Sequence, residues 1–177
     1  NKGLDGLGEF SLAISAGAII LSLASFTGFT FYPYVSNLAI IEKEKAFLKT
    51  KKLSLKIIYF SLSISFILII IKNIYRGNLN FYPFTINSLD LFLSFLGYGF
   101  LGAYQVAQPF ASALTDSIKV FKIELTSSAI SLGLIYLITL DNKFSIHLAL
   151  LSFCLYTFSN YVQANYRNFK IFKEKNL

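Results

Sequence analysis

Residues 57–74 read IIYFSLSISFILIIIKNI, and Lys72 is the one charged side chain in this run. A predominantly apolar run of about eighteen residues or more is long enough to cross a bilayer as an α-helix. Transmembrane β-strands would instead alternate polar and apolar residues over about ten positions, and this run keeps no such alternation. The stretch therefore predicts a membrane-spanning helix.

Four further apolar runs accompany this one, and together they predict membrane spans at 10–31, 57–74, 86–113, 117–140 and 144–162. The composition agrees, because 55% of the 177 residues are hydrophobic and only 14% are charged. Roughly a quarter of the residues in a soluble domain are charged. The sequence predicts an all-α integral membrane bundle of about five transmembrane helices, forming a single membrane domain over 1–177.

The cations lie mainly between the apolar runs. If the predicted spans alternate in direction, twelve of the sixteen Lys and Arg residues fall on one side of the membrane. They lie in a predicted basic loop (42–56), in the lead-in to the fourth span and in the tail (165–177). The positive-inside rule places these segments in the cytoplasm and the N-terminal end outside. A net charge of +7 can also indicate nucleic-acid binding, but such proteins gather cations on one solvated face. We expect membrane lipid, and no nucleic acid, as a partner.

The third run, 86–113, carries the most polar interior. As residues that line a cavity we rank Gln105 and Gln108 first, then Tyr104, then Asp90. Polar side chains in lipid are costly and normally face another helix or a water-filled cavity. The run therefore predicts a cavity-lining helix, with interhelical hydrogen bonding without transport as the alternative. For Asp90, near the outer edge, the alternative is a solvated residue at the helix start.

Small residues in the same run predict close helix packing. Residues 97–102, GYGFLG, match a dinucleotide-binding fingerprint, but that motif needs a preceding strand and a solvent-facing helix N-terminus. A stripe at intervals of four residues predicts helix contact instead: Gly99, Ala103, Ala107 and Ala111. We also expect Pro33 to break or kink the first span and Pro109 to bend the third.

The sequence shows no nucleophile, base and orienting residue in a catalytic pattern. One Cys and one His exclude a disulfide framework and a zinc site of the usual ligand count. Cys154 is predicted to fill space in the fifth span. His147 is predicted to be a packed or interfacial histidine, with a role in proton transfer as the alternative. We expect no enzyme, no metal and no cofactor.

Three stretches resemble a known family. Residues 3–13, GLDGLGEFSLA, resemble the segment leading into a span of bacterial polysaccharide flippases. Residues 32–36, YPYVS, followed by basic residues, are similar to an aromatic-proline segment in the second half of those proteins. The QPF of 108–110 and the Asn- and Lys-rich tail also fit their C-terminal part. These flippases belong to the multidrug/oligosaccharidyl-lipid/polysaccharide exporter superfamily, which includes the O-antigen translocases, and the resemblance covers essentially the whole chain.

The resemblance implies that this chain is the second lobe of a roughly twelve-helix transporter, with the missing N-terminal half of the same protein as its partner. It further implies a bacterial inner-membrane location and the flipping of an undecaprenyl-diphosphate-linked oligosaccharide for surface polysaccharide such as O-antigen or capsule. One departure is that an anionic substrate favours cations in the cavity, whereas no Lys or Arg lies deep inside the predicted spans. A drug exporter of the same superfamily and a small structural or assembly membrane protein remain alternatives.

Overall fold

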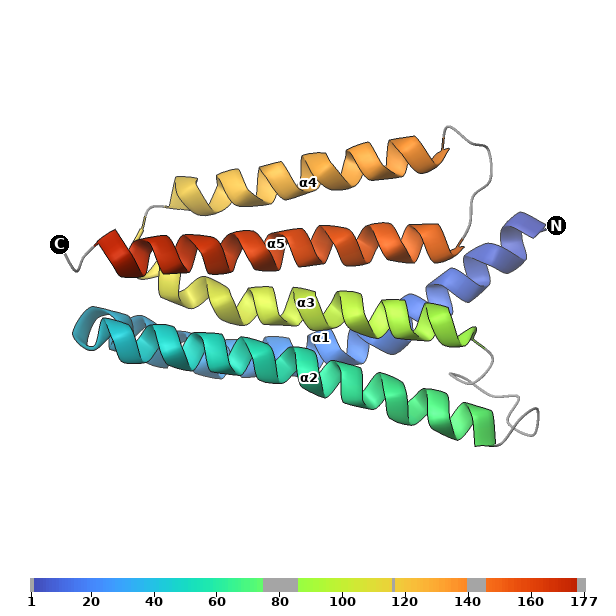
Figure 1. Ribbon diagram of the computed structural model, residues 1–177, viewed down its shortest axis with the longest axis horizontal. Helices are drawn as coiled ribbons and strands as arrows, with labels where there is room; N and C mark the ends of the chain where they lie inside the picture. Colours follow the sequence, from blue (N-terminus) through green and yellow to red (C-terminus); the bar gives the residue numbers. More distant parts are fainter. Residues whose placement is uncertain (1, 75–85, 116, 140–145, 175–177) are drawn as a thin grey trace.

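The protein is an all-α membrane helical bundle. A computed structural model describes residues 2–74, 86–115, 117–139 and 146–174. These residues form five helices: α1 (Lys2–Ile41), α2 (Lys43–Ile74), α3 (Ser88–Ser112), α4 (Ser117–Thr139) and α5 (Ile146–Glu174). The helices run roughly side by side, and the two chain ends lie at opposite ends of the bundle (Figure 1).

Three of these helices, α1, α2 and α3, are long and apolar enough to cross a membrane. They contain almost all of the predicted spans 10–31, 57–74 and 86–113, whose residue 113 directly follows α3. The predicted spans 117–140 and 144–162 lie largely in α4 and α5, and their residues 140, 144 and 145 are outside the described part of the chain. That α4 and α5 cross the membrane remains a prediction.

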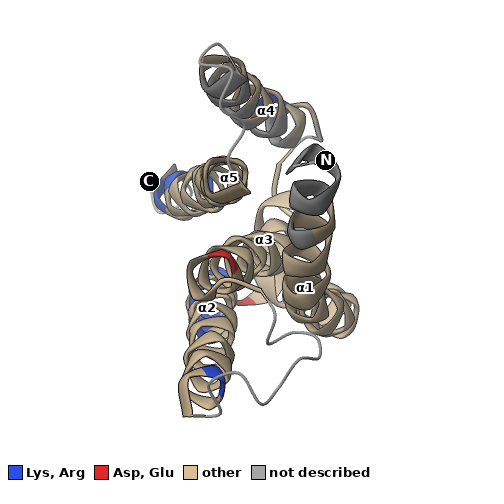
Figure 2. Cartoon of the chain, turned by 90° about the vertical axis from the view of Figure 1, so that its right-hand side faces the viewer, with Lys and Arg blue, Asp and Glu red and all other residues tan. Residues whose placement is uncertain are grey.

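Helix α3 is the central element, because it packs against α1, α2 and α5 (Figures 1 and 2). Its glycines explain this position, since each lets a different neighbour approach closely. A Cβ atom added at each would crowd a side chain of a different helix: Gly97 (Phe153 of α5, 2.6 Å), Gly99 (Ser61 of α2, 2.9 Å) and Gly102 (Ala24 of α1, 2.6 Å). The four small residues of the predicted packing stripe, Gly99, Ala103, Ala107 and Ala111, are all buried.

Helix α2 meets the bundle through small and polar side chains. Its buried positions recur every three or four residues, the spacing of one helix face: Ala46, Thr50, Ser54, Ile58, Ser61 and Ser65. Ser61 Oγ donates to the carbonyl of Phe95 on α3 over 2.5 Å. The serines at 61 and 65 thus lie in a helix interface, whereas Ser63 is exposed and donates to the carbonyl of Tyr59 in its own helix.

The segment predicted as a basic loop, 42–56, is helical, so that prediction is wrong. Only Glu42 separates α1 from α2, which begins at Lys43. Lys, Glu, Leu and Ala are good helix formers, and a fall in hydropathy does not end a helix that has such residues. For the same reason α5 continues through the predicted tail to Glu174. Helix α1 also continues through Pro33, which therefore does not break it.

The basic residues of the described chain gather on two elements. In Figure 2 the ribbon is coloured for Lys and Arg at several positions along α2 and at the C-terminal end of α5. These segments meet, since the Lys43 ammonium donates to the carbonyls of Ile171 (2.5 Å) and Phe172 (3.0 Å). The start of α2 and the end of α5 therefore lie at the same end of the bundle.

Candidate functional site: a polar cavity between α1 and α3

Three cavities of about 460 to 620 Å³ lie among the described residues, and the largest of these three lies between α1 and α3. Its volume of about 620 Å³ is in the usual range for small-molecule sites. Its lining combines polar and aromatic side chains: Ser25, Gly28, Phe29, Tyr32, Pro33, Gln105 and Gln108. We call this the α1–α3 cavity.

The two glutamines that the sequence ranked first both line this cavity. Gln105 Oε1 accepts a hydrogen bond from Ser25 Oγ of α1 over 3.0 Å. Gln108 Nε2 donates to the hydroxyl of Tyr104, one turn away on α3, over 2.6 Å. Both glutamine side chains are half-buried. They combine contact with the protein and access to the cavity, which a ligand-binding amide requires.

Tyr104 lies behind the cavity rather than on its wall. Its side chain is buried and packs with Ala107 of α3 and Ala164 of α5. Its hydroxyl nevertheless fixes one orientation of Gln108. The structure therefore makes Tyr104 a positioning residue, whereas the sequence ranked it as a lining residue.

Gly28 gives the cavity its room on the α1 side. A Cβ atom added there would meet no other atom within 4 Å, so open space lies over this residue. Gln105 is seven residues, or about 10 Å along the helix axis, from the last residue of α3. The cavity thus lies in the half of the bundle nearer to the α1–α2 turn.

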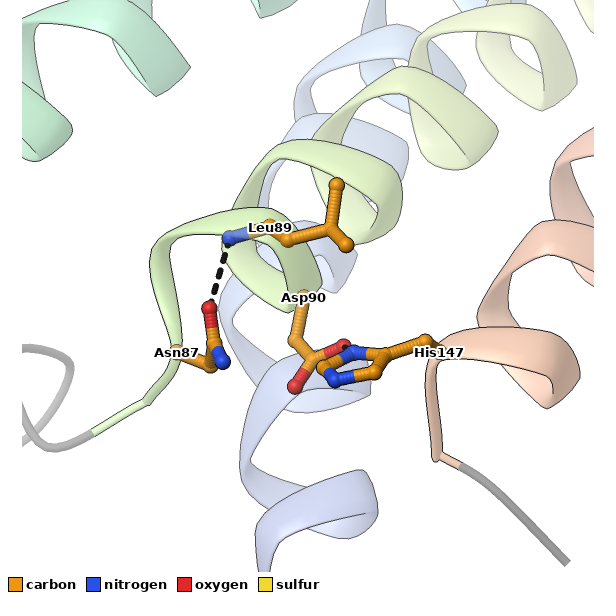
Figure 3. A network of polar contacts seen from close by, with 4 residues as sticks. All are labelled: Asn87, Leu89, Asp90 and His147. Atoms are coloured by element: carbon orange, nitrogen blue, oxygen red, sulfur yellow. Dashed lines mark hydrogen bonds and ion pairs between the residues drawn. The ribbon is translucent and has the colours of Figure 1, made fainter.

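Asp90 does not belong to this cavity. It lies fifteen residues before Gln105, about 22 Å away along α3. Its side chain is only 3% exposed, and Oδ1 is 2.5 Å from Nδ1 of His147 on α5 (Figure 3). Because Asp90 is buried, the alternative that it is a solvated residue is wrong, and the α1–α3 cavity is not lined by it. Asn87 caps the same helix end by accepting from the backbone N–H of Leu89.

A second groove, between α1 and α2, has a volume of about 480 Å³ and apolar walls. We call it the α1–α2 groove, and Lys56 is its one charged lining residue. The next residue, Ile57, lies 3.2 Å from a Cβ added at Gly102, near the middle of α3. Lys56 is exposed and directly precedes the predicted span 57–74.

The one cysteine of the chain, Cys154, lies outside the α1–α3 cavity. The Cys154 thiol is buried and donates to the carbonyl of Leu93 over 2.7 Å. Within the ranges that the structure describes, no group of three or more His, Cys, Asp and Glu residues could hold a metal ion. The lining of the α1–α3 cavity offers amides, hydroxyls and aromatic rings.

Comparison with known proteins gives no match to a family model, to a curated protein or to a solved structure.

Proposed function

We propose that this protein is part of a transporter that flips a lipid-linked oligosaccharide across the bacterial inner membrane for surface polysaccharide synthesis. The observation that carries the proposal is the α1–α3 cavity, where Gln105 and Gln108 lie half-buried among helices long enough to span a membrane. An inert bundle would bury such costly polar groups against another helix. Here Gln105 bonds to Ser25 of α1, but the amides of Gln105 and Gln108 also border the open space of the cavity.

The chemistry of the cavity suits a sugar. Amide and hydroxyl groups both donate and accept hydrogen bonds, as sugar hydroxyls do. Phe29 and Tyr32 add apolar surface to the same wall, against which the less polar face of a sugar ring can pack. The absence of charged residues from the lining of this cavity favours a neutral oligosaccharide over a charged drug at this position.

The mechanism follows from the architecture of two-lobed transporters. This chain supplies the second lobe, the missing N-terminal half supplies the first, and rocking of the lobes exposes the central cavity to each side in turn. By the distribution of its cations, the N-terminal end of the chain faces outside and the C-terminal end faces the cytoplasm. The substrate carrier would be undecaprenyl diphosphate, as the family resemblance implies.

The test replaces both cavity amides with apolar side chains of similar size in the intact protein. We expect Gln105→Leu/Gln108→Leu to reduce surface polysaccharide at least tenfold in cells that lack the wild-type gene, while the membrane abundance of the protein stays the same. Gln163→Leu is the matched control, because Gln163 lies on α5 and bonds to Ser159 Oγ outside the cavity. Export that survives the double substitution would show that the cavity is not the path. Normal export in the gene deletion would rule out the function.

A further inference from the structure

The α1–α2 groove, which the proposed function does not use, has the form of a lipid site. Its walls are almost entirely apolar: Ile20, Leu23, Ala24, Phe26, Thr27, Leu53, Ile57 and Phe60, with Lys56 among them. Phe26 and Phe60 are 72% and 50% exposed. A groove with open aromatic edges, on helices long enough to span a membrane, faces the acyl chains of the bilayer.

The depth of Lys56 requires an explanation. It precedes Ile57, which contacts the position of Gly102, and Gly102 is ten residues or about 15 Å from the end of α3. If α3 crosses a hydrocarbon core about 30 Å thick, the backbone of Lys56 lies well inside it. A charged side chain at that depth is expensive unless it meets water or an opposite charge.

Two lysines nearer the α1–α2 turn, Lys45 and Lys49, differ from Lys56 because they have partners. Lys45 forms an ion pair with Glu42 at 2.9 Å. Lys49 contacts the hydroxyl of Tyr34, with its ammonium 4.7 Å from the ring centroid. Among the described residues, no carboxylate lies within ion-pair distance of Lys56. Lys56 is thus an exposed cation of α2 that lines an apolar groove.

Lys45, Lys49, Lys52 and Lys56 are spaced by four, three and four residues, which places them on one side of α2. Lys56 ends this row where the apolar walls of the groove begin. An anionic phospholipid has the matching arrangement, since its phosphate is linked through glycerol to two apolar acyl chains. The row also attracts anionic lipids to this side of the bundle, at about 1 kcal/mol for each basic residue near the surface.

We propose that the α1–α2 groove binds one anionic phospholipid, with an acyl chain between the two helices and the phosphate accepting hydrogen bonds from the Lys56 ammonium. The bound lipid neutralises the cation and covers the aromatic edges of Phe26 and Phe60. Binding is independent of the transport cycle, so it can be tested without an export assay.

The absence of tryptophan from the chain makes a fluorescence test specific. Phe60→Trp places one fluorophore in the groove, and Phe66→Trp places one on an exposed part of α2 outside it. Each purified variant is reconstituted with brominated phosphatidylglycerol or brominated phosphatidylcholine of the same chains, because bromine quenches tryptophan on contact. We expect phosphatidylglycerol to quench Phe60→Trp at about fivefold lower mole fraction than phosphatidylcholine, the ratio that 1 kcal/mol gives. Phe66→Trp should show no such preference.

The same assay tests the role of the cation. Adding Lys56→Gln to Phe60→Trp should abolish the preference for phosphatidylglycerol, whereas adding Lys51→Gln should preserve it, since Lys51 is an exposed lysine of α2 outside the groove. Equal quenching by the two lipids in Phe60→Trp would overturn the proposal. So would a preference that survives Lys56→Gln, or one that Phe66→Trp shares.

Discussion

The Asp90 carboxylate on α3 and the His147 imidazole on α5 are 2.5 Å apart, although 57 residues separate them in the sequence. Asp90 lies in the first turn of α3, where the helix dipole favours a negative charge. His147 is the second residue of α5. The pair therefore joins the N-terminal ends of two helices (Figure 3). The α1–α3 cavity lies toward the opposite end of α3.

Removing the histidine should destabilise the bundle, because the buried Asp90 carboxylate would lose its partner. We expect His147→Ala to lower the free energy of unfolding in detergent by about 1.5 kcal/mol, the low end for a hydrogen bond to a charged group, since the His147 side chain is 45% exposed. Unfolding followed by circular dichroism measures this. In the double variant Asp90→Asn/His147→Ala the two losses should be non-additive. Additive losses would show that the two side chains do not interact.

An added methyl group at Gly102 should lower the stability of the bundle. A Cβ there would lie 2.6 Å from Ala24 Cβ, an atom fixed to its own backbone, so the two helices must move apart. We expect Gly102→Ala to cost about 1 to 3 kcal/mol, as overpacking does. Gly133→Ala on α4 is the control, because a Cβ there meets nothing within 4 Å and alanine favours the helix. Equal stabilities of the two variants in detergent unfolding would contradict the packing of α1 on α3.

Substitutions of two α2 serines should differ in their effect on the free energy of unfolding, because the two hydroxyls bond to different helices. Ser61 reaches the Phe95 carbonyl on α3, whereas Ser63 reaches a carbonyl of its own helix. Interhelical hydrogen bonds in membrane proteins contribute about 0.6 kcal/mol on average. We expect Ser61→Ala to lose about that much unfolding free energy and Ser63→Ala to lose none measurable. The reverse order would place Ser63, not Ser61, in the helix interface.

Local sequence predicted the fold class because apolar runs and helix length are local properties. The run 57–74 lies within α2. Hydropathy located the change from polar to apolar side chains at residue 57, whereas the helix itself begins at Lys43. Helix propensity continued α2 back to Lys43, so Lys56 lies within a helix long and apolar enough to span a membrane. A propensity estimate over 43–56 could have found this extension.

The contacts between helices were not predictable from one sequence. Gly97, Gly99 and Gly102 formed one recognisable pattern, but which neighbour each would face depends on where α1, α2 and α5 lie around α3. The same holds for Ser25 and Gln105, which are 80 residues apart. Asp90 and His147 were each noticed for their chemistry, and only the fold shows that they form a pair.

Transport through the α1–α3 cavity requires that water reaches Gln105. The rate of thiol labelling at residue 105 measures this access to water. With Cys154 replaced by Ser, Gln105→Cys is compared with two variants at similar depth in membranes. They are Val106→Cys, which is buried, and Leu55→Cys, which is exposed on α2 outside both the cavity and the groove. We predict that a charged, membrane-impermeant thiol reagent modifies Gln105→Cys at least tenfold faster than either control. Labelling of Gln105→Cys as slow as that of Val106→Cys and Leu55→Cys would contradict a water-filled path.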